Sequence, residues 1–221
     1  MITLVPACIP VSLEDIFRVA KLIKPFTRDF HIDVVDGIAV DALSWPYGSG
    51  EGSGDPHEAR NLADMFEIEY HLMVADCLLE LPRYLAARPR RIVVQIETCV
   101  DIALAHRMAH EAGVLLGLSV GNDIDLDFVL AELAHVDYVQ CMGIHTIGAQ
   151  GQPLDKEVFL RMQAIHEHYP TLPIAVDGSV NQHTIARFAV SPASRLIVGS
   201  AIIKQADPEA AYRALAAATL S

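Results

Sequence analysis

The sequence predicts one α/β domain over residues 1–221, folded as a (β/α)₈ barrel, also called a TIM barrel. Three observations favour this fold. Eight short apolar runs alternate with amphipathic segments from one end of the chain to the other. Eight strand–helix pairs in about this length are typical of the barrel. With 221 residues, 52% of them hydrophobic, the chain can bury one sizeable core, and no linker divides it.

The short apolar runs are predicted to be the eight strands. In chain order they occupy residues 2–5, 30–34, 68–74, 91–96, 114–120, 136–142, 172–176 and 195–198. The segments between them carry apolar residues at three- and four-residue spacing, which predicts helices, for example over residues 12–23, 101–112 and 156–168.

Capping residues agree with this division. Ser12 is followed three residues later by Asp15, which resembles a capping box and predicts that a helix begins there. Gly113 is expected to end the helix that precedes the fifth strand. One segment, residues 47–55 with GSGEGSG at its centre, is too poor in apolar side chains to predict a fixed shape. It is expected to be a mobile surface loop or, alternatively, a mobile cover over a site.

Composition excludes several classes of partner. Sixteen Lys and Arg against 28 Asp and Glu give a net charge of −12, so neither nucleic acid nor an anionic membrane is expected to bind. No run approaches the roughly 18 apolar residues of a membrane span. The N-terminus has no basic region or cleavage site, and we expect a cytoplasmic protein. Its four cysteines lack the spacing of a zinc ribbon or disulfide framework and are expected to be reduced and mostly buried.

Ionisable residues lie where three of the apolar runs end, and in a barrel the carboxyl ends of the strands carry the function. His31 and Asp33 share one face of the second strand, because side chains alternate along a strand. His71 lies in the second half of the third strand, and Asp177 directly follows the seventh. Unpaired buried charges cost several kcal/mol each, whereas a divalent cation neutralises two carboxylates. The four residues therefore predict a metal site for Zn, Fe(II), Mn or Co.

Glycine-rich turns follow the last three predicted strands. After strands seven and eight of a barrel, such turns commonly hold a phosphate on backbone N–H groups. An anionic ligand can thus bind locally to this acidic protein. The predicted phosphate- and substrate-binding residues are Gly148, Gly151, Gly178, Ser179, Gly199 and Ser200.

Several motifs resemble the ribulose-phosphate 3-epimerase family over almost the whole chain. They are HIDVVDG at 31–37, HLMV at 71–74, VDGSVN at 176–181 and VGSAII at 198–203. The resemblance implies a barrel of the ribulose-phosphate-binding type, with the metal on His31, Asp33, His71 and Asp177. It also implies that Asp33 and Asp177 form the acid/base pair. Met73 and Met142 are implied to cover the reacting enediolate, or alternatively they are ordinary core residues.

The chemistry implied by the resemblance is physically coherent. Epimerisation beside a ketone removes a proton from one face of a carbon and returns one to the other, so two carboxylates must flank it. Asp33 and Asp177 come from strands far apart in the sequence. Glu97, after the fourth strand, is expected either to accept a hydrogen bond behind the metal ligands or to be a structural polar residue. His145 is expected at the mouth of the barrel, in contact with substrate or solvated.

Other loop segments depart from the family pattern, notably after strands two, five and six. The motifs therefore favour the family's chemistry, whereas they leave the identity of the substrate undecided. Ribulose 5-phosphate, converted to xylulose 5-phosphate, is the first expectation, and the VDGSVN motif raises a six-carbon substrate such as allulose 6-phosphate. A non-catalytic sugar-phosphate-binding or interaction relative is a further alternative. A lyase of the same superfamily is disfavoured because the second strand carries His-x-Asp with no nearby Lys.

The remaining expectations concern assembly and surface. A barrel of this kind often forms a homo-oligomer through faces away from the site. Four histidines on the predicted helices, His106, His110, His166 and His168, are expected to be solvated.

Overall fold

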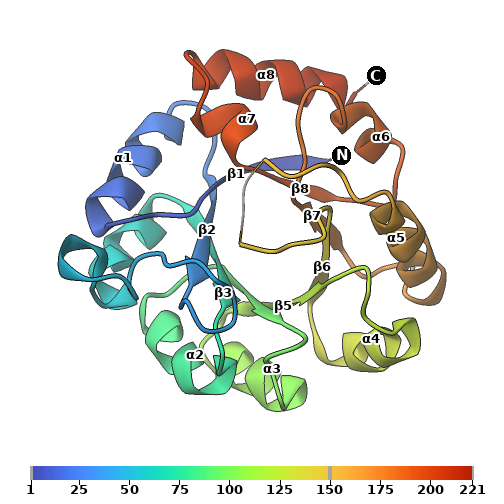
Figure 1. Ribbon diagram of the computed structural model, residues 1–221, viewed down its shortest axis with the longest axis horizontal. Helices are drawn as coiled ribbons and strands as arrows, with labels where there is room; N and C mark the ends of the chain where they lie inside the picture. Colours follow the sequence, from blue (N-terminus) through green and yellow to red (C-terminus); the bar gives the residue numbers. More distant parts are fainter. Residues whose placement is uncertain (1, 149–150, 221) are drawn as a thin grey trace.

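The computed structural model describes residues 2–148 and 151–220, so Ala149 and Gln150 of the predicted glycine-rich turn lie outside the described residues. Eight parallel strands, β1 to β8, close into a barrel in chain order, and β8 pairs with β1. Helices surround the barrel (Figure 1). The predicted (β/α)₈ barrel is therefore confirmed.

All eight strands coincide with predicted apolar runs, with small shifts at their ends. Their bounds are β1 Thr3–Cys8, β2 Asp29–Val35, β3 Glu67–Met73, β4 Arg91–Gln95, β5 Leu115–Val120, β6 Tyr138–Met142, β7 Ile174–Asp177 and β8 Arg195–Val198.

The α-helices are α1 Leu13–Ile23, α2 Cys77–Ala86, α3 Ile102–Glu111, α4 Leu126–Glu132, α5 Glu157–His168, α6 Ile185–Ala189, α7 Ser200–Ile203 and α8 Pro208–Ala218. They do not follow one per strand. Between β2 and β3 the chain forms two 3₁₀ helices, η1 Gly50–Gly52 and η2 Pro56–Asp64, whereas β8 is followed by both α7 and α8. A third 3₁₀ helix, η3 Leu133–His135, follows α4.

The capping predictions hold for α1 and α3. Ser12 is the N-cap of α1, and its side chain accepts a hydrogen bond from the backbone N–H of Asp15. Gly113 follows α3 with a φ of 73°, a left-handed conformation that glycine adopts without strain.

The glycine-rich segment has a defined shape, so the expectation of a shapeless loop is wrong. Backbone hydrogen bonds join Gly48 to Gly52 and Gly54 to Pro46. Tyr47 donates to Glu80 of α2 through its hydroxyl, at 2.5 Å. A Cβ on Gly54 would lie 2.5 Å from the indole nitrogen of Trp45, so this glycine lets the segment pack against a buried tryptophan.

The main core lies between the barrel and its helices, where it includes Phe30, Ile32, Val34, Leu72 and Val94. Residues of opposite parity point into the barrel, and this interior is unusually polar for a buried region. It contains His31, Asp33, Glu69, His71, Gln95, Ser119 and Gln140, all buried. Among the helices of residues 2–148 and 151–220, none is long and apolar enough to cross a membrane.

Candidate metal and catalytic site

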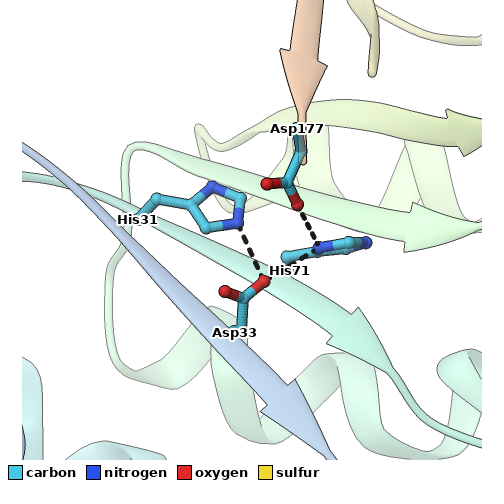
Figure 2. Close-up of side chains that lie close together, drawn as sticks. All are labelled: His31, Asp33, His71 and Asp177. Atoms are coloured by element: carbon cyan, nitrogen blue, oxygen red, sulfur yellow. Dashed lines mark hydrogen bonds and ion pairs between the residues drawn. The ribbon is translucent and has the colours of Figure 1, made fainter. Parts of the chain in front are cut away.

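Two histidines and two aspartates converge at the carboxyl ends of three strands. His31 and Asp33 come from β2, His71 from β3 and Asp177 from the end of β7. One ligand atom from each residue lies within 4.8 Å of the others. Asp33 and Asp177 reach toward His71 from opposite sides (Figure 2). The β2 and β3 strands place Asp33 directly beside His71 in the register.

Asp33 links the two imidazoles. Its Oδ1 lies 3.2 Å from His31 Nε2 and 3.1 Å from His71 Nδ1. The same His71 nitrogen lies 3.6 Å from Asp177 Oδ2. Four potential ligand atoms, one per residue, thus face a common centre.

The outward nitrogen of each imidazole is held by another buried side chain. His31 Nδ1 lies 2.7 Å from Glu69 Oε1, and Gln95 Nε2 lies 2.9 Å from His71 Nε2. These contacts fix the orientation of each ring and direct its other nitrogen toward Asp33. A partner behind a metal-binding histidine commonly has this role.

Carboxylates control the protonation of both rings. Burial alone would lower the pKa of His31, but Asp33 and Glu69 outweigh burial and raise this pKa to about 10. Burial also opposes protonation of His71, yet hydrogen bonds to Asp177 and Asp33 raise its pKa. Burial favours the neutral form of Asp33, but the two histidines hold its pKa well below the usual range. The centre of the site therefore favours positive charge.

These residues fit a divalent cation. Imidazole and carboxylate together suit Zn and other first-row metals. A cation bound at His71 Nδ1 leaves the ring proton on Nε2, which must then donate to Gln95. Among the described residues, Gln95 Oε1 and Gln140 Oε1 are buried without a hydrogen-bond partner. Rotating the Gln95 amide by 180° would bring its oxygen to His71 Nε2, so a cation at Nδ1 accounts for one of these orphaned oxygens.

A buried ionic network lies behind His31. Glu69 Oε2 accepts a hydrogen bond from Tyr138 at 3.0 Å and lies 3.4 Å from a guanidinium nitrogen of Arg195. Arg195 also pairs with Asp29 at 3.1 Å. Burial raises the pKa of Glu69, but His31 and Arg195 outweigh it and hold this pKa below its usual value. Glu69 therefore stays ionised and faces His31 with a full negative charge.

A pocket opens above the four residues, and Asp33 and Asp177 form part of its wall. Both predicted methionines, Met73 and Met142, line it and are otherwise buried. All predicted phosphate-binding residues also line it: Gly148, Gly151, Gly178, Ser179, Gly199 and Ser200. No Lys or Arg is found among the described lining residues, so hydrogen-bond donors on this wall come from the backbone and from neutral side chains.

One supporting residue, Glu97, lies elsewhere than expected, and His145 is exposed, in line with the solvated one of its two expected placements. Glu97 is exposed beyond the end of β4, and Gln95 of the same strand contacts His71 instead. Gln95 reaches His71 and Glu97 does not, because Gln95 lies two residues deeper in the barrel. His145 is exposed after β6 and is not among the described residues that line the pocket.

Three further residues at the site were not among those predicted, although the sequence contains signals for them. Glu69 has the same strand parity as His71, and an acidic residue on the inner face of an apolar strand marks a buried charge. Gln140 shares its face with Met142 and donates toward Asp177 Oδ2 at 3.4 Å. Asn181, within the VDGSVN motif, lines the pocket.

Known protein families and curated relatives match this chain over most of its length. Residues 11–203 match the model of the "Ribulose-phosphate 3 epimerase family". Among curated relatives, ribulose-phosphate 3-epimerase of Aquifex aeolicus (strain VF5) is 27% identical over 195 residues, covering 86% of this chain and 84% of that protein. The enzyme of the same name from Mycobacterium tuberculosis (strain ATCC 25618 / H37Rv) is 27% identical over 190 residues, covering 84% and 79%.

Solved structures share the barrel. A 3-hexulose-6-phosphate synthase aligns with a TM-score of 0.74 at 19% identity, covering 98% of this chain and 99% of that chain. KGPDC from Streptococcus mutans aligns with a TM-score of 0.76 at 12% identity, covering 99% and 97%. At these identities the similarity establishes the fold alone. The family match does more: the chain belongs to the ribulose-phosphate 3 epimerase family, a family of isomerases.

Proposed function

We propose that this protein epimerises carbon 3 of a ketose phosphate, with ribulose 5-phosphate and xylulose 5-phosphate as its substrate pair. The observation that carries the proposal is the placement of Asp33 and Asp177 on opposite sides of His71, both on the wall of one pocket. Proton removal on one face of a carbon and delivery to the other needs two such groups.

Asp33 and Asp177 have the acid/base roles in this proposal. One carboxylate takes the proton at carbon 3 while the other, protonated, supplies a proton to the opposite face. The roles exchange in the reverse direction. Met73 and Met142 line the same pocket and would cover the planar reacting carbons with apolar, polarisable surface.

The four converging residues would hold a divalent cation, either Zn, Fe(II), Mn or Co. When bound, such an ion supplies Lewis-acid stabilisation of the negative charge that develops on the substrate oxygens. His31 Nε2 and His71 Nδ1 are the imidazole atoms positioned for it, since Glu69 and Gln95 occupy the other ring nitrogens. Glu69 would act behind His31 by keeping its ring in place.

The phosphate of the substrate would lie against the turns after β7 and β8. Gly178 and Ser179 have positive φ values of 101° and 57°, so the chain bends sharply at this wall of the pocket. With Gly199 and Ser200 they offer backbone N–H groups and two hydroxyls to an anion. Gly148 and Gly151, which follow β6 and line the pocket, would lie against the substrate.

Incubation in D₂O tests the function directly. Metal-loaded protein is mixed with ribulose 5-phosphate or with allulose 6-phosphate, and deuterium at carbon 3 is followed by NMR. Exchange with the first substrate supports the proposal, and faster exchange with the second would reassign the substrate to six carbons. Stabilisation by a sugar phosphate without exchange would identify a binding protein instead.

The setting is part of the proposal. The four cysteines, all within the described residues, are buried and free of disulfides, which fits the reducing cytoplasm. We also propose a homo-oligomer, which sedimentation equilibrium would test.

A further inference from the structure

A second group of potential metal ligands lies outside the pocket, at the other end of the barrel. It comprises His106 and His110 of α3 and Asp137, the residue before β6. Asp137 bonds to Leu116 at the amino end of β5, whereas Asp33 and Asp177 belong to the carboxyl ends of their strands. We propose that His106, His110 and Asp137 form a separate surface site for a first-row divalent cation such as Zn²⁺.

The helix positions both imidazoles on one face. Residues four apart in an α-helix are neighbours on its surface, and this spacing is used by pairs of zinc-binding histidines. The His106 and His110 ring centroids are 4.0 Å apart. Two protonated imidazoles at this separation would repel each other, whereas two neutral imidazoles can share a cation.

Asp137 supplies the third ligand at the point where the rings meet. Its Oδ1 lies 3.0 Å from His110 Nε2 and 3.7 Å from His106 Nε2. A hydrogen bond explains the 3.0 Å distance to His110. The 3.7 Å distance from His106 to the same oxygen is too long for a hydrogen bond. For metal bonds of about 2.0–2.1 Å at tetrahedral angles, ligand atoms lie about 3.3 Å apart, and the two observed distances bracket this value.

The carboxylate is held in place by the backbone. Asp137 Oδ2 accepts a hydrogen bond from the Leu116 N–H at 2.8 Å, and the backbone N–H of Asp137 donates to the Leu116 carbonyl at 2.9 Å. Side-chain exposures of 28% for His106, 51% for His110 and 21% for Asp137 leave the cluster accessible from solvent. Three protein ligands leave a fourth position for water, and bound metal would join α3 to the start of β6.

The chemistry of the donors decides the class of ion. Two imidazoles and one carboxylate suit Zn²⁺, Co²⁺, Ni²⁺ or Cu²⁺, whereas Mg²⁺ and Ca²⁺ prefer oxygen ligands alone. This site is independent of the proposed epimerase reaction, because none of its residues lines the pocket.

Zn²⁺ titration of the metal-depleted full chain by calorimetry tests the proposal. We expect wild-type protein to bind two equivalents and the His106→Ala/His110→Ala variant to bind one, with epimerase activity unchanged. The matched control is His166→Ala/His168→Ala on α5, because residues two apart do not share a helix face. This control should still bind two equivalents.

A second variant keeps the test independent of folding. Asp137→Asn retains an acceptor for the Leu116 N–H but loses the charged ligand, and should weaken the second equivalent at least about tenfold. Far-ultraviolet circular dichroism checks the fold of each variant. The proposal is overturned if the histidine variant binds as many equivalents as the wild type, if the control loses the same equivalent, or if Asp137→Asn binds with unchanged affinity.

Discussion

His31 and Glu69 form a 2.7 Å contact inside the barrel, with both side chains fully buried. The two residues face each other across neighbouring strands, because the register pairs His31 of β2 with Glu69 of β3. Glu69 contacts Nδ1 of His31, which points away from the other site residues. It thereby leaves Nε2 as the nitrogen available to a cation. The predictions below begin with this pair.

Glu69→Gln should weaken metal binding by about 10- to 100-fold, because the amide keeps the shape but removes the charge behind His31. It also leaves Arg195 with one fewer buried partner, which should lower the free energy of unfolding by about 3 kcal/mol. Calorimetric metal titration and denaturant unfolding measure the two effects. Glu67→Gln is the control, since this glutamate of the same strand is half-exposed and pairs with the exposed Arg90 at 3.5 Å. Equal losses in both variants would contradict a special role for Glu69.

Asp33→Asn and Asp177→Asn should each reduce turnover by roughly 10²- to 10⁴-fold, the range for loss of a general acid or base. Each variant should keep proton exchange from only one of the two epimers, because the other carboxylate still faces its own side of the carbon. Deuterium exchange measured separately for each epimer reports this split. Asp123→Asn, an exposed residue after β5, serves as the control. An unchanged rate in either active-site variant would remove that aspartate from the mechanism.

Gly117→Ala should destabilise the barrel by about 1–3 kcal/mol through overpacking. A Cβ at Gly117 would lie 2.4 Å from the Cζ atom of Tyr138, so the ring would have to move. That movement would break the hydrogen bond from the Tyr138 hydroxyl to Glu69. Tyr138→Phe removes only that hydrogen bond and should cost about 1 kcal/mol. Denaturant unfolding of both variants makes the comparison. A smaller loss for Gly117→Ala than for Tyr138→Phe would show that the barrel interior accommodates the methyl group.

Gly148→Ala should raise the KM for the sugar phosphate more than Gly151→Ala. Both glycines line the pocket and both have positive φ, 78° and 81°, so alanine introduces the same backbone strain in each. Only at Gly148 would the new methyl group collide, at 2.4 Å from a Val40 methyl carbon. Adding Val40→Ala to Gly148→Ala should restore KM to the Gly151→Ala value. Steady-state kinetics of the three variants measures this, and equal KM values for the two single variants would exclude the Val40 contact as a constraint on the loop.

Local sequence signals were sufficient for the barrel. Each strand produced a short apolar run, and Ser12 and Gly113 marked helix ends, because burial and capping act on neighbours in the chain. The segment between β2 and β3 was predicted less well. Its many glycines predict a segment without a fixed shape. In the structure, however, Gly54 packs on Trp45, a contact that arises only in the folded chain.

Strand parity and the positions of the strand ends are local signals, and they were enough to place His31, Asp33, His71 and Asp177 inside one end of a barrel. Which residues support these four, and where a second cluster forms, became clear from the packing of the folded chain. Gln95 rather than Glu97 contacts His71, and Asp137 meets His106 and His110, which the sequence assigned to solvated surface. The physical reason is that parity is a local property of a strand, whereas depth in the barrel and contacts between separate elements depend on how the strands and helices pack together.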